Sequence, residues 1–104
     1  MHENKVKQNI SSPNFGYLLD TGNYKPKELI YENILKLGKS IKVVHAKTYD
    51  FNDNGEEPTL NFEKIIENLK KIGYDGFYSV EFEGRSWGDL EGTQKTLELL
   101  RKYL

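Results

Sequence analysis

Short apolar runs alternate with segments of helical periodicity along most of this 104-residue chain. The three runs cover residues 15–20, 41–47 and 77–82, and each has the length of a strand. Between and after them, apolar residues recur at spacings of three and four, as on one face of a helix. The order β-α-β-α-β-α predicts an α/β fold with parallel strands joined by right-handed crossovers.

Three helices are expected to follow the strands. The first begins near Pro26 and ends at Gly38, the second runs from an Asn61 cap to Gly73, and the third starts at an Asp89 cap. Their expected buried stripes are Leu29, Ile30, Ile34 and Leu37; Phe62, Ile65, Ile66, Leu69 and Ile72; and Leu90, Leu97, Leu100 and Leu104. Crossovers of one hand place such helices on one face of the sheet, so the other face needs further strands or a second copy to cover it.

Composition excludes several classes of protein. No apolar run approaches the roughly 20 residues of a membrane helix. The first five residues are mostly polar and lack a signal-peptide pattern. The absence of cysteine excludes disulfides. We therefore expect a cytoplasmic protein. The net charge of −1, with both signs interleaved, predicts neither a nucleic-acid partner nor a membrane partner.

A residue that can bind a metal or move a proton stands in the last part of each apolar run: Asp20, His45 and Glu81. Parallel neighbouring strands bring these residues to one edge of the sheet, where α/β proteins build their sites. Carboxylate oxygen and imidazole nitrogen together suit a divalent cation. The structural alternative is that Asp20 caps a loop, His45 is a hydrogen-bonded strand residue, and Glu81 pairs with Arg85 or Lys47.

Lys47 follows His45 by two residues, so it should lie on the same face of the strand. Its ammonium could contact a substrate oxygen or phosphate. The alternative is a solvated lysine that pairs with Glu81 or Glu83.

Loop residues at the same edge are further candidates for substrate contact. Arg85 and Trp87 lie in the loop after the third run, where barrels often bind substrate. Trp87 could stack on a sugar ring or simply cover the core. Asn23 could stabilise its own turn through its side chain.

Three segments carry a resemblance to a known family. Residues 12–23 (SPNFGYLLDTGN) resemble the sixth strand of sugar phosphate isomerase/epimerase proteins, which belong to the xylose isomerase-like TIM-barrel superfamily. Residues 42–47 (KVVHAK) resemble the seventh strand, and residues 73–83 (GYDGFYSVEFE) resemble the end of the seventh helix and the eighth strand. The resemblance covers about residues 10–104. It implies a partial (β/α)8 barrel over residues 13–104, with residues 1–12 as a polar leader or a helix remnant.

The resemblance also implies a chemistry. Family members hold a divalent metal, for example Mn²⁺, Mg²⁺, Zn²⁺ or Co²⁺, with strand-end carboxylates and one histidine, so Asp20, His45 and Glu81 match three ligands. Glu81 also matches one of two carboxylates that exchange a proton next to a sugar carbonyl. Asn23 matches a position that contacts substrate. The implied partner is a sugar or sugar phosphate.

The chain is much shorter than the roughly 250 residues of a TIM barrel. Five strands are missing, one of them bearing the second proton-exchanging glutamate. The resemblance thus implies an isomerase or epimerase fragment with little activity alone. Two alternatives are a non-catalytic module that forms a homo-oligomer through its open sheet face, and the C-terminal half of a split enzyme that an N-terminal half completes. Multi-zinc DNA-repair endonucleases of the superfamily fit poorly, because the chain has two histidines and no basic bias.

Overall fold

The computed structural model describes residues 16–104. Its elements are β1 (Tyr17–Asp20), α2 (Leu29–Leu37), the short 3-10 helix η1 (Gly38–Ser40), β2 (Ile41–Thr48), α3 (Phe62–Lys71), β3 (Phe77–Phe82) and α4 (Asp89–Tyr103). This order confirms the predicted alternation of strands and helices. The predicted leader of residues 1–12 and its boundary lie outside the described residues.

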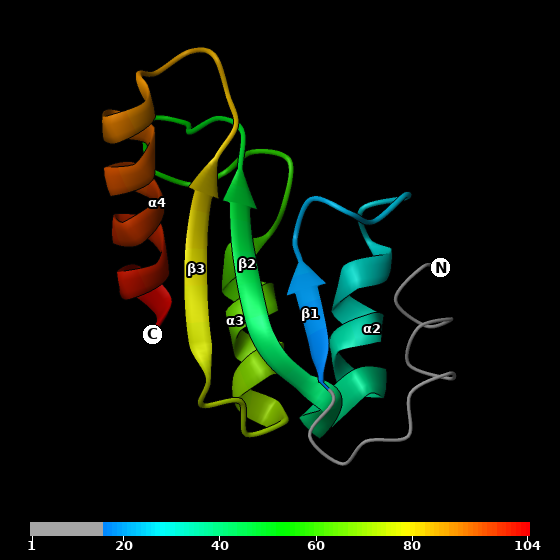
Figure 1. The fold of residues 1–104 in the computed structure, drawn as a ribbon. Coiled ribbons are helices and arrows are strands. Elements are labelled where there is room, and N and C mark those ends of the chain that lie inside the picture. The colour runs from blue at the N-terminus through cyan, green and yellow to red at the C-terminus, as the bar shows by residue number, and fades with distance from the viewer. Residues whose placement is uncertain (1–15) are drawn as a thin grey trace.

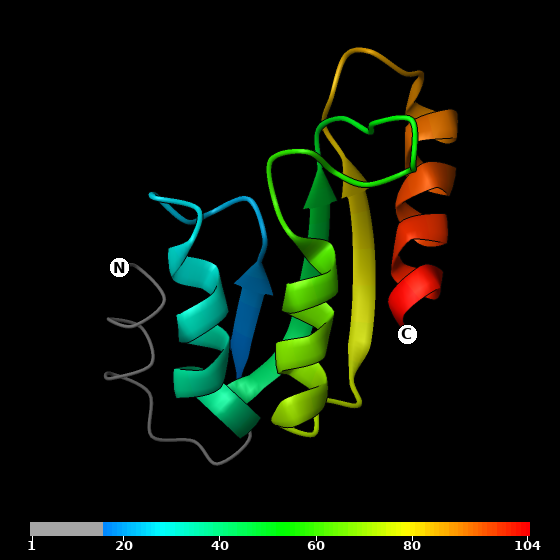
Figure 2. The same cartoon turned by 180° about the vertical axis from the view of Figure 1, so that it is seen from behind.

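The three strands form one parallel sheet in the order β1-β2-β3. Figure 1 shows the sheet in front of α3, and Figure 2, from behind, shows α2 and α3 in front of the sheet with α4 beside β3. The helices therefore share one side of the sheet, as right-handed crossovers require. The architecture is three consecutive β/α units around one parallel sheet, as predicted. No helix within residues 16–104 has both the length and the apolar character needed to cross a membrane.

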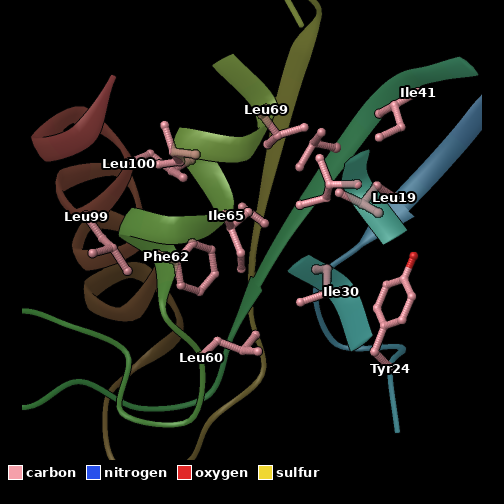
Figure 3. Close-up of a cluster of buried hydrophobic side chains, with 14 of the residues drawn as sticks. Leu19, Tyr24, Ile30, Ile41, Leu60, Phe62, Ile65, Leu69, Leu99 and Leu100 are labelled. Atoms are coloured by element: carbon pink, nitrogen blue, oxygen red, sulfur yellow. The ribbon is translucent and has the colours of Figure 1, made fainter. Parts of the chain in front are cut away.

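The hydrophobic core lies between the helices and the sheet (Figure 3). Among its most buried members are Leu19 and Val44 from the strands, Ile30 and Ile34 from α2, Phe62, Ile65, Ile66 and Leu69 from α3, and Leu99 and Leu100 from α4. Fully burying one such side chain contributes roughly 1.5–3 kcal/mol, so this layer supplies most of the stabilising free energy of the fold.

Helix α3 follows the sequence prediction closely. The side chain of Asn61 accepts a hydrogen bond from the backbone N–H of Lys64 at 3.0 Å, which caps the first turn. The predicted stripe faces the core, with Ile72 partly buried at its end. Gly73 follows the helix with φ +76°, a conformation that favours glycine.

Helix α2 begins later than predicted. It starts at Leu29 rather than near Pro26, and the Leu29 side chain is exposed. The carbonyl of Pro26 accepts the N–H of Leu29 in a turn that leads into the helix. The predicted end is confirmed, since Gly38 follows the helix with φ +50°.

The predicted buried stripe of α4 is confirmed at Leu100, and Leu97 is partly buried, but it is wrong at both ends. Leu90 and Leu104 are exposed, whereas the helix buries Gly92, Thr96, Leu99 and Leu100. A Cβ atom on Gly92 would overlap the ring of Phe82, so the missing side chain is what allows α4 to approach β3. Asp89 is not the cap either. Gly88 occupies the N-cap position, and Asp89 lies in the first turn, where a carboxylate suits the helix dipole.

The face of the sheet opposite the helices, called here the open face, carries two kinds of side chain. Strand register places Leu18, Val43 and Phe77 in one apolar row, with Phe77 83% exposed. The next row toward the carboxyl ends holds Asp20, His45 and Ser79, followed by the pair Lys47 and Glu81. The open face is therefore apolar toward the amino ends of the strands, and it carries polar and charged side chains toward their carboxyl ends.

Candidate metal centre

Asp20, His45 and Glu81 converge near the carboxyl ends of the three strands. Each offers one ligand atom, and these atoms all lie within 4.8 Å of one another. Asp20 and His45 are neighbours in register, while Glu81 comes from the following row. A set of two carboxylate oxygens and one imidazole nitrogen at this spacing fits a divalent cation. Their role as ligands stays a prediction.

Asp20 is 8% exposed and makes two contacts. Its Oδ1 accepts the backbone N–H of Gly22 at 2.8 Å, and its Oδ2 lies 3.3 Å from Nζ of Lys47. The next N–H, that of Asn23, donates to the carbonyl of Asp20 at 3.2 Å and closes a tight turn. Asp20 thus does cap its loop, as the structural alternative held, and it also faces the cluster.

Lys47 lies among the same carboxylates. Its Nζ is 3.3 Å from Oδ2 of Asp20 and 3.9 Å from Oε1 of Glu81, and its side chain is 16% exposed. Burial lowers the pKa of Lys47, but the charge of Asp20 and its hydrogen bond outweigh burial, so the pKa is raised overall. The ion pair with Glu81 that the sequence left open is present, and Asp20 is the closer partner.

Thr21 joins β1 to β2, two of the three strands that carry the candidate ligands. Its Oγ1 donates to the carbonyl of Lys47 and accepts the N–H of Lys47, both at 2.8 Å, and its own N–H donates to the carbonyl of His45 at 3.1 Å. Thr21 is almost fully buried. The sequence analysis missed this residue, because a threonine after a strand gives no sign of which neighbouring backbone it will bind.

Tyr49 borders the cluster and was also missed. A Cβ atom on Gly22 would overlap the hydroxyl of Tyr49 and lie 3.3 Å from Oδ1 of Asp20, so the phenol and the carboxylate approach the same point. Burial raises the pKa of Tyr49, and the positive charge of Lys47 offsets part of that rise. A usable signal existed, because residues 45, 47 and 49 alternate onto one face of an extended chain.

The loop candidates lie apart from the cluster in their contacts. Asn23 and Arg85 are exposed. Trp87 packs against the core, and Nζ of Lys95 sits 4.2 Å from its ring centroid. Within residues 16–104, no hydrogen bond or ion pair joins Arg85 or Trp87 to the three clustered side chains. The contacts of these three residues with substrate stay predictions. The packing of Trp87 agrees with the alternative that it covers the core.

The family model described as xylose isomerase-like TIM barrel matches residues 4–103. The chain belongs to the xylose isomerase-like TIM-barrel family. This match confirms the resemblance and the fold class. It also indicates which part of a complete barrel the open face corresponds to. In a complete barrel of this family, the side of the strands opposite the helices is the barrel interior.

Two of the proteins that this chain resembles are deglycosidase subunits. Over 71 residues, 68% of this chain, it is 38% identical to the C-glycoside deglycosidase alpha subunit of Arthrobacter globiformis. Over 44 residues, 42% of this chain, it is 41% identical to the 3'-dehydrocarminate deglycosidase alpha subunit of a Microbacterium species. The chain covers 20% and 13% of these two proteins.

A third relative extends over nearly the whole chain. An uncharacterized protein of Methanocaldococcus jannaschii is 29% identical over 110 aligned positions, which cover 96% of this chain and 35% of that protein. The chain therefore spans about a third of the length of this relative and less of the others. The described residues hold three β/α units of this fold.

Proposed function

We propose that this chain supplies the last three β/α units of a sugar or sugar phosphate isomerase or epimerase, which moves a proton next to a carbonyl with the help of a divalent metal. The observation that carries the proposal is the convergence of Asp20, His45 and Glu81 at the carboxyl edge of the sheet. Membership of the xylose isomerase-like family supports it. The deglycosidase names of two relatives support a carbohydrate substrate and a multi-subunit enzyme.

Asp20, His45 and Glu81 would hold the metal. When bound, such an ion polarises a carbonyl or hydroxyl oxygen and stabilises the negative charge that develops there. The Glu81 side chain is 47% exposed on the open face, which would line the interior of a completed barrel, so its carboxylate would be free to take up and return the substrate proton. Lys47 can place a positive charge beside substrate oxygens.

Substrate contacts are also assigned to the loops at this edge. Asn23 follows the Asp20 turn, and Arg85 and Trp87 lie between β3 and α4. Barrel enzymes hold their substrates with loops at the carboxyl ends of the strands, which is where all three residues stand.

Completion of the barrel would be required for turnover. The second proton-exchanging carboxylate belongs to a strand that this chain does not supply, so the chain alone should have little or no isomerase activity. The partner that supplies it would be the N-terminal half of the barrel or a separate subunit. The exposed apolar row of the open face, with Phe77 83% exposed, is the surface that the missing strands would cover.

A Mn²⁺ titration tests the metal centre directly. Paramagnetic Mn²⁺ should broaden the imidazole signals of His45 in NMR spectra of the full chain, and a His45→Ala variant assigns them, because the chain has a second histidine. Asp20→Ala and Glu81→Ala should each weaken Mn²⁺ binding by about tenfold or more, since each removes a charged ligand. Glu63→Ala, on an exposed position of α3, should change nothing.

The same titration can refute the proposal. If the His45 signals stay sharp at millimolar Mn²⁺, and do not shift with Mg²⁺ or Zn²⁺, the three side chains do not form a metal centre in this chain.

A second candidate is a non-catalytic module that self-associates. The row of Leu18, Val43 and Phe77 favours it, because an exposed apolar strip of this kind can be covered by another copy of the chain as well as by missing strands.

A further inference from the structure

Asp20 stands at the end of a strand that has few backbone hydrogen bonds to hold it. Strand β1 is four residues long and, within residues 16–104, pairs only with β2, as Figure 1 shows. The register between the two strands shifts between Tyr17 and Leu18, so regular pairing covers only the end of β1. Because a short strand makes few ladder hydrogen bonds, the position of Asp20 relative to β2 needs further support.

Thr21 supplies that support with its side chain and its backbone. Its Oγ1 donates to the carbonyl of Lys47 and accepts the N–H of Lys47, both at 2.8 Å, and its own N–H donates to the carbonyl of His45 at 3.1 Å. The hydroxyl thus continues the contact between the two strands beyond the last residue of β1. Because both the N–H and the carbonyl of Lys47 are bound, the orientation of its backbone is fixed as well.

The hydroxyl of Thr21 lies where water reaches poorly, since the residue is 1% exposed. Removal of the hydroxyl would take these partners from the N–H and the carbonyl of Lys47, and water could not replace them without a rearrangement. Backbone groups that lose their partners in such a place are unfavourable. The end of β1 and the turn after it would therefore move relative to β2.

Such a movement would act on the clustered side chains. Oδ2 of Asp20 lies 3.3 Å from Nζ of Lys47, and the backbone of Lys47 is bound by the residue next to Asp20, so these contacts form a closed ring. The ligand atoms of Asp20 and His45 now lie within 4.8 Å of each other. A shift of β1 would change that spacing, and a divalent ion tolerates little change, because its bonds to oxygen and nitrogen are roughly 2.0–2.6 Å long.

We propose that Thr21 is the positioning residue of the candidate metal centre. Its hydroxyl holds Asp20 at the distance from His45 at which both side chains bind one ion, and Thr21 itself does not touch the ion. The metal in this inference rests on the proposed function. The positioning of Asp20 against Lys47 rests only on the contacts of Thr21 and Asp20.

Mn²⁺ titrations of variants of the full chain test the role of the hydroxyl. Thr21→Val keeps the shape of the side chain and removes the hydroxyl, so the dissociation constant for Mn²⁺ should rise by about tenfold. Thr21→Ser retains the hydroxyl and should bind Mn²⁺ nearly as tightly as the wild type. Urea unfolding of each variant identifies the conditions under which it is folded.

Thr96→Val is the matched control. Thr96 is fully buried, and its hydroxyl pairs with that of Thr48 and donates to the carbonyl of Gly92, both at 2.8 Å. The substitution removes the same group from an equally buried site away from the cluster. It should lower the free energy of unfolding and leave the affinity for Mn²⁺ unchanged.

The ammonium of Lys47 gives a second measurement that needs no metal. In proton–nitrogen correlation spectra of lysine side chains, an ammonium held against Asp20 should exchange slowly enough to be observed, and Lys47→Met assigns its signal. Thr21→Val should broaden this signal or shift it toward those of exposed lysines, whereas Thr96→Val should not. A wild type that binds no Mn²⁺ would remove the proposed function, and the ammonium signal would then decide the positioning by itself.

Several outcomes would overturn the proposal. They are Mn²⁺ binding by folded Thr21→Val as tight as that of the wild type, equal weakening by Thr96→Val, binding by Thr21→Ser as weak as by Thr21→Val, and an unchanged Lys47 ammonium signal in Thr21→Val. Should Thr21→Val fail to fold, the wild type decides. Because coupling is reciprocal, saturating Zn²⁺ should then slow amide exchange at Lys47 more than at Leu69 in α3, and equal slowing would contradict the proposal.

Discussion

The charge of Lys47 should affect both the stability of the cluster and its affinity for a metal ion. Its ammonium lies between the carboxylates of Asp20 and Glu81, at 3.3 and 3.9 Å, and compensates the charge of a nearly buried aspartate. A divalent cation held by the same carboxylates would feel repulsion from that ammonium. Lys47 should therefore stabilise the fold and weaken metal binding at the same time.

Replacement of Lys47 by methionine separates these two effects. Lys47→Met should lower the free energy of unfolding by about 1–3 kcal/mol, because Asp20 loses its charged partner. It should also tighten Mn²⁺ binding by about tenfold, so that added Mn²⁺ restores the lost stability. Urea unfolding with and without Mn²⁺ measures both effects. Lys39→Met is the control, and unchanged or weaker Mn²⁺ affinity in Lys47→Met would contradict the prediction.

Single residues differ in how far the sequence reveals them. Asp20, His45 and Glu81 could be predicted to cluster, because parallel strands of known order bring their ends together. Thr21 could not, since its role depends on contacts across 26 residues. The alternation of residues 45, 47 and 49 indicates the face of Tyr49 but not its close approach to Gly22. Periodicity predicts which face a side chain takes, but not which partner it meets there.

Among the larger elements, the loop between β2 and α3 is unusual for having a buried carboxylate at its centre. Glu57 accepts hydrogen bonds from both ends of the loop, and Oδ1 of Asn52 accepts the N–H groups of Asn54 and Glu56 at 2.9 and 3.0 Å. These side-chain hydrogen bonds pair backbone N–H groups of the loop, which has no helix or strand to pair them. The order of this loop should therefore depend on Glu57.

Glu57→Gln tests that dependence. The amide keeps one acceptor oxygen but points an N–H₂ group at backbone donors, so the free energy of unfolding should fall by about 2 kcal/mol. Amide hydrogen exchange at Tyr49 and Thr59 should accelerate more than exchange in α3. Glu63→Gln, at an exposed site, serves as the matched substitution. Equal protection of the loop in both variants would show that Glu57 does not organise it.

Helices α3 and α4 show what sequence periodicity can and cannot predict. The stripe of α3 is made of large apolar residues, and the prediction was correct. The stripe of α4 includes Gly92 and Thr96, which a search for leucines passes over. Thr96 is buried because its hydroxyl pairs with that of Thr48 at 2.8 Å, and Gly92 is buried because Phe82 leaves no room for a side chain. Close packing and a buried hydrogen bond therefore place α4 together with the hydrophobic burial of Leu99 and Leu100.

On the scale of the whole molecule, the open face is the dominant feature. The helices cover one side of the sheet, and the described chain leaves the other side bare, as Figure 1 shows. The sequence predicted this imbalance from the handedness of the crossovers alone. It could not predict what covers the bare side, because that information belongs to chains or segments outside these three units.

Analytical ultracentrifugation tests whether copies of the chain cover one another. If they do, the chain should sediment as a dimer or larger species at micromolar concentration, and Phe77→Asp should shift it to monomer with little change in folding free energy, since Phe77 is 83% exposed. Leu35→Asp, on an exposed position of α2, should leave the mass unchanged. A wild-type monomer at these concentrations would exclude the self-associating module and leave completion by missing strands.

If the proposed completion by a separate chain is correct, the open face would also change how activity responds to dilution. When the ligands of a site stand on one polypeptide and its second carboxylate on another, turnover follows the amount of the joined pair rather than the amount of either chain. Concentration then acts as a switch, because mass action separates the pair below its dissociation constant. The activity of such a partial barrel would depend on the concentration of its counterpart, and it would be lost when that concentration fell well below the dissociation constant.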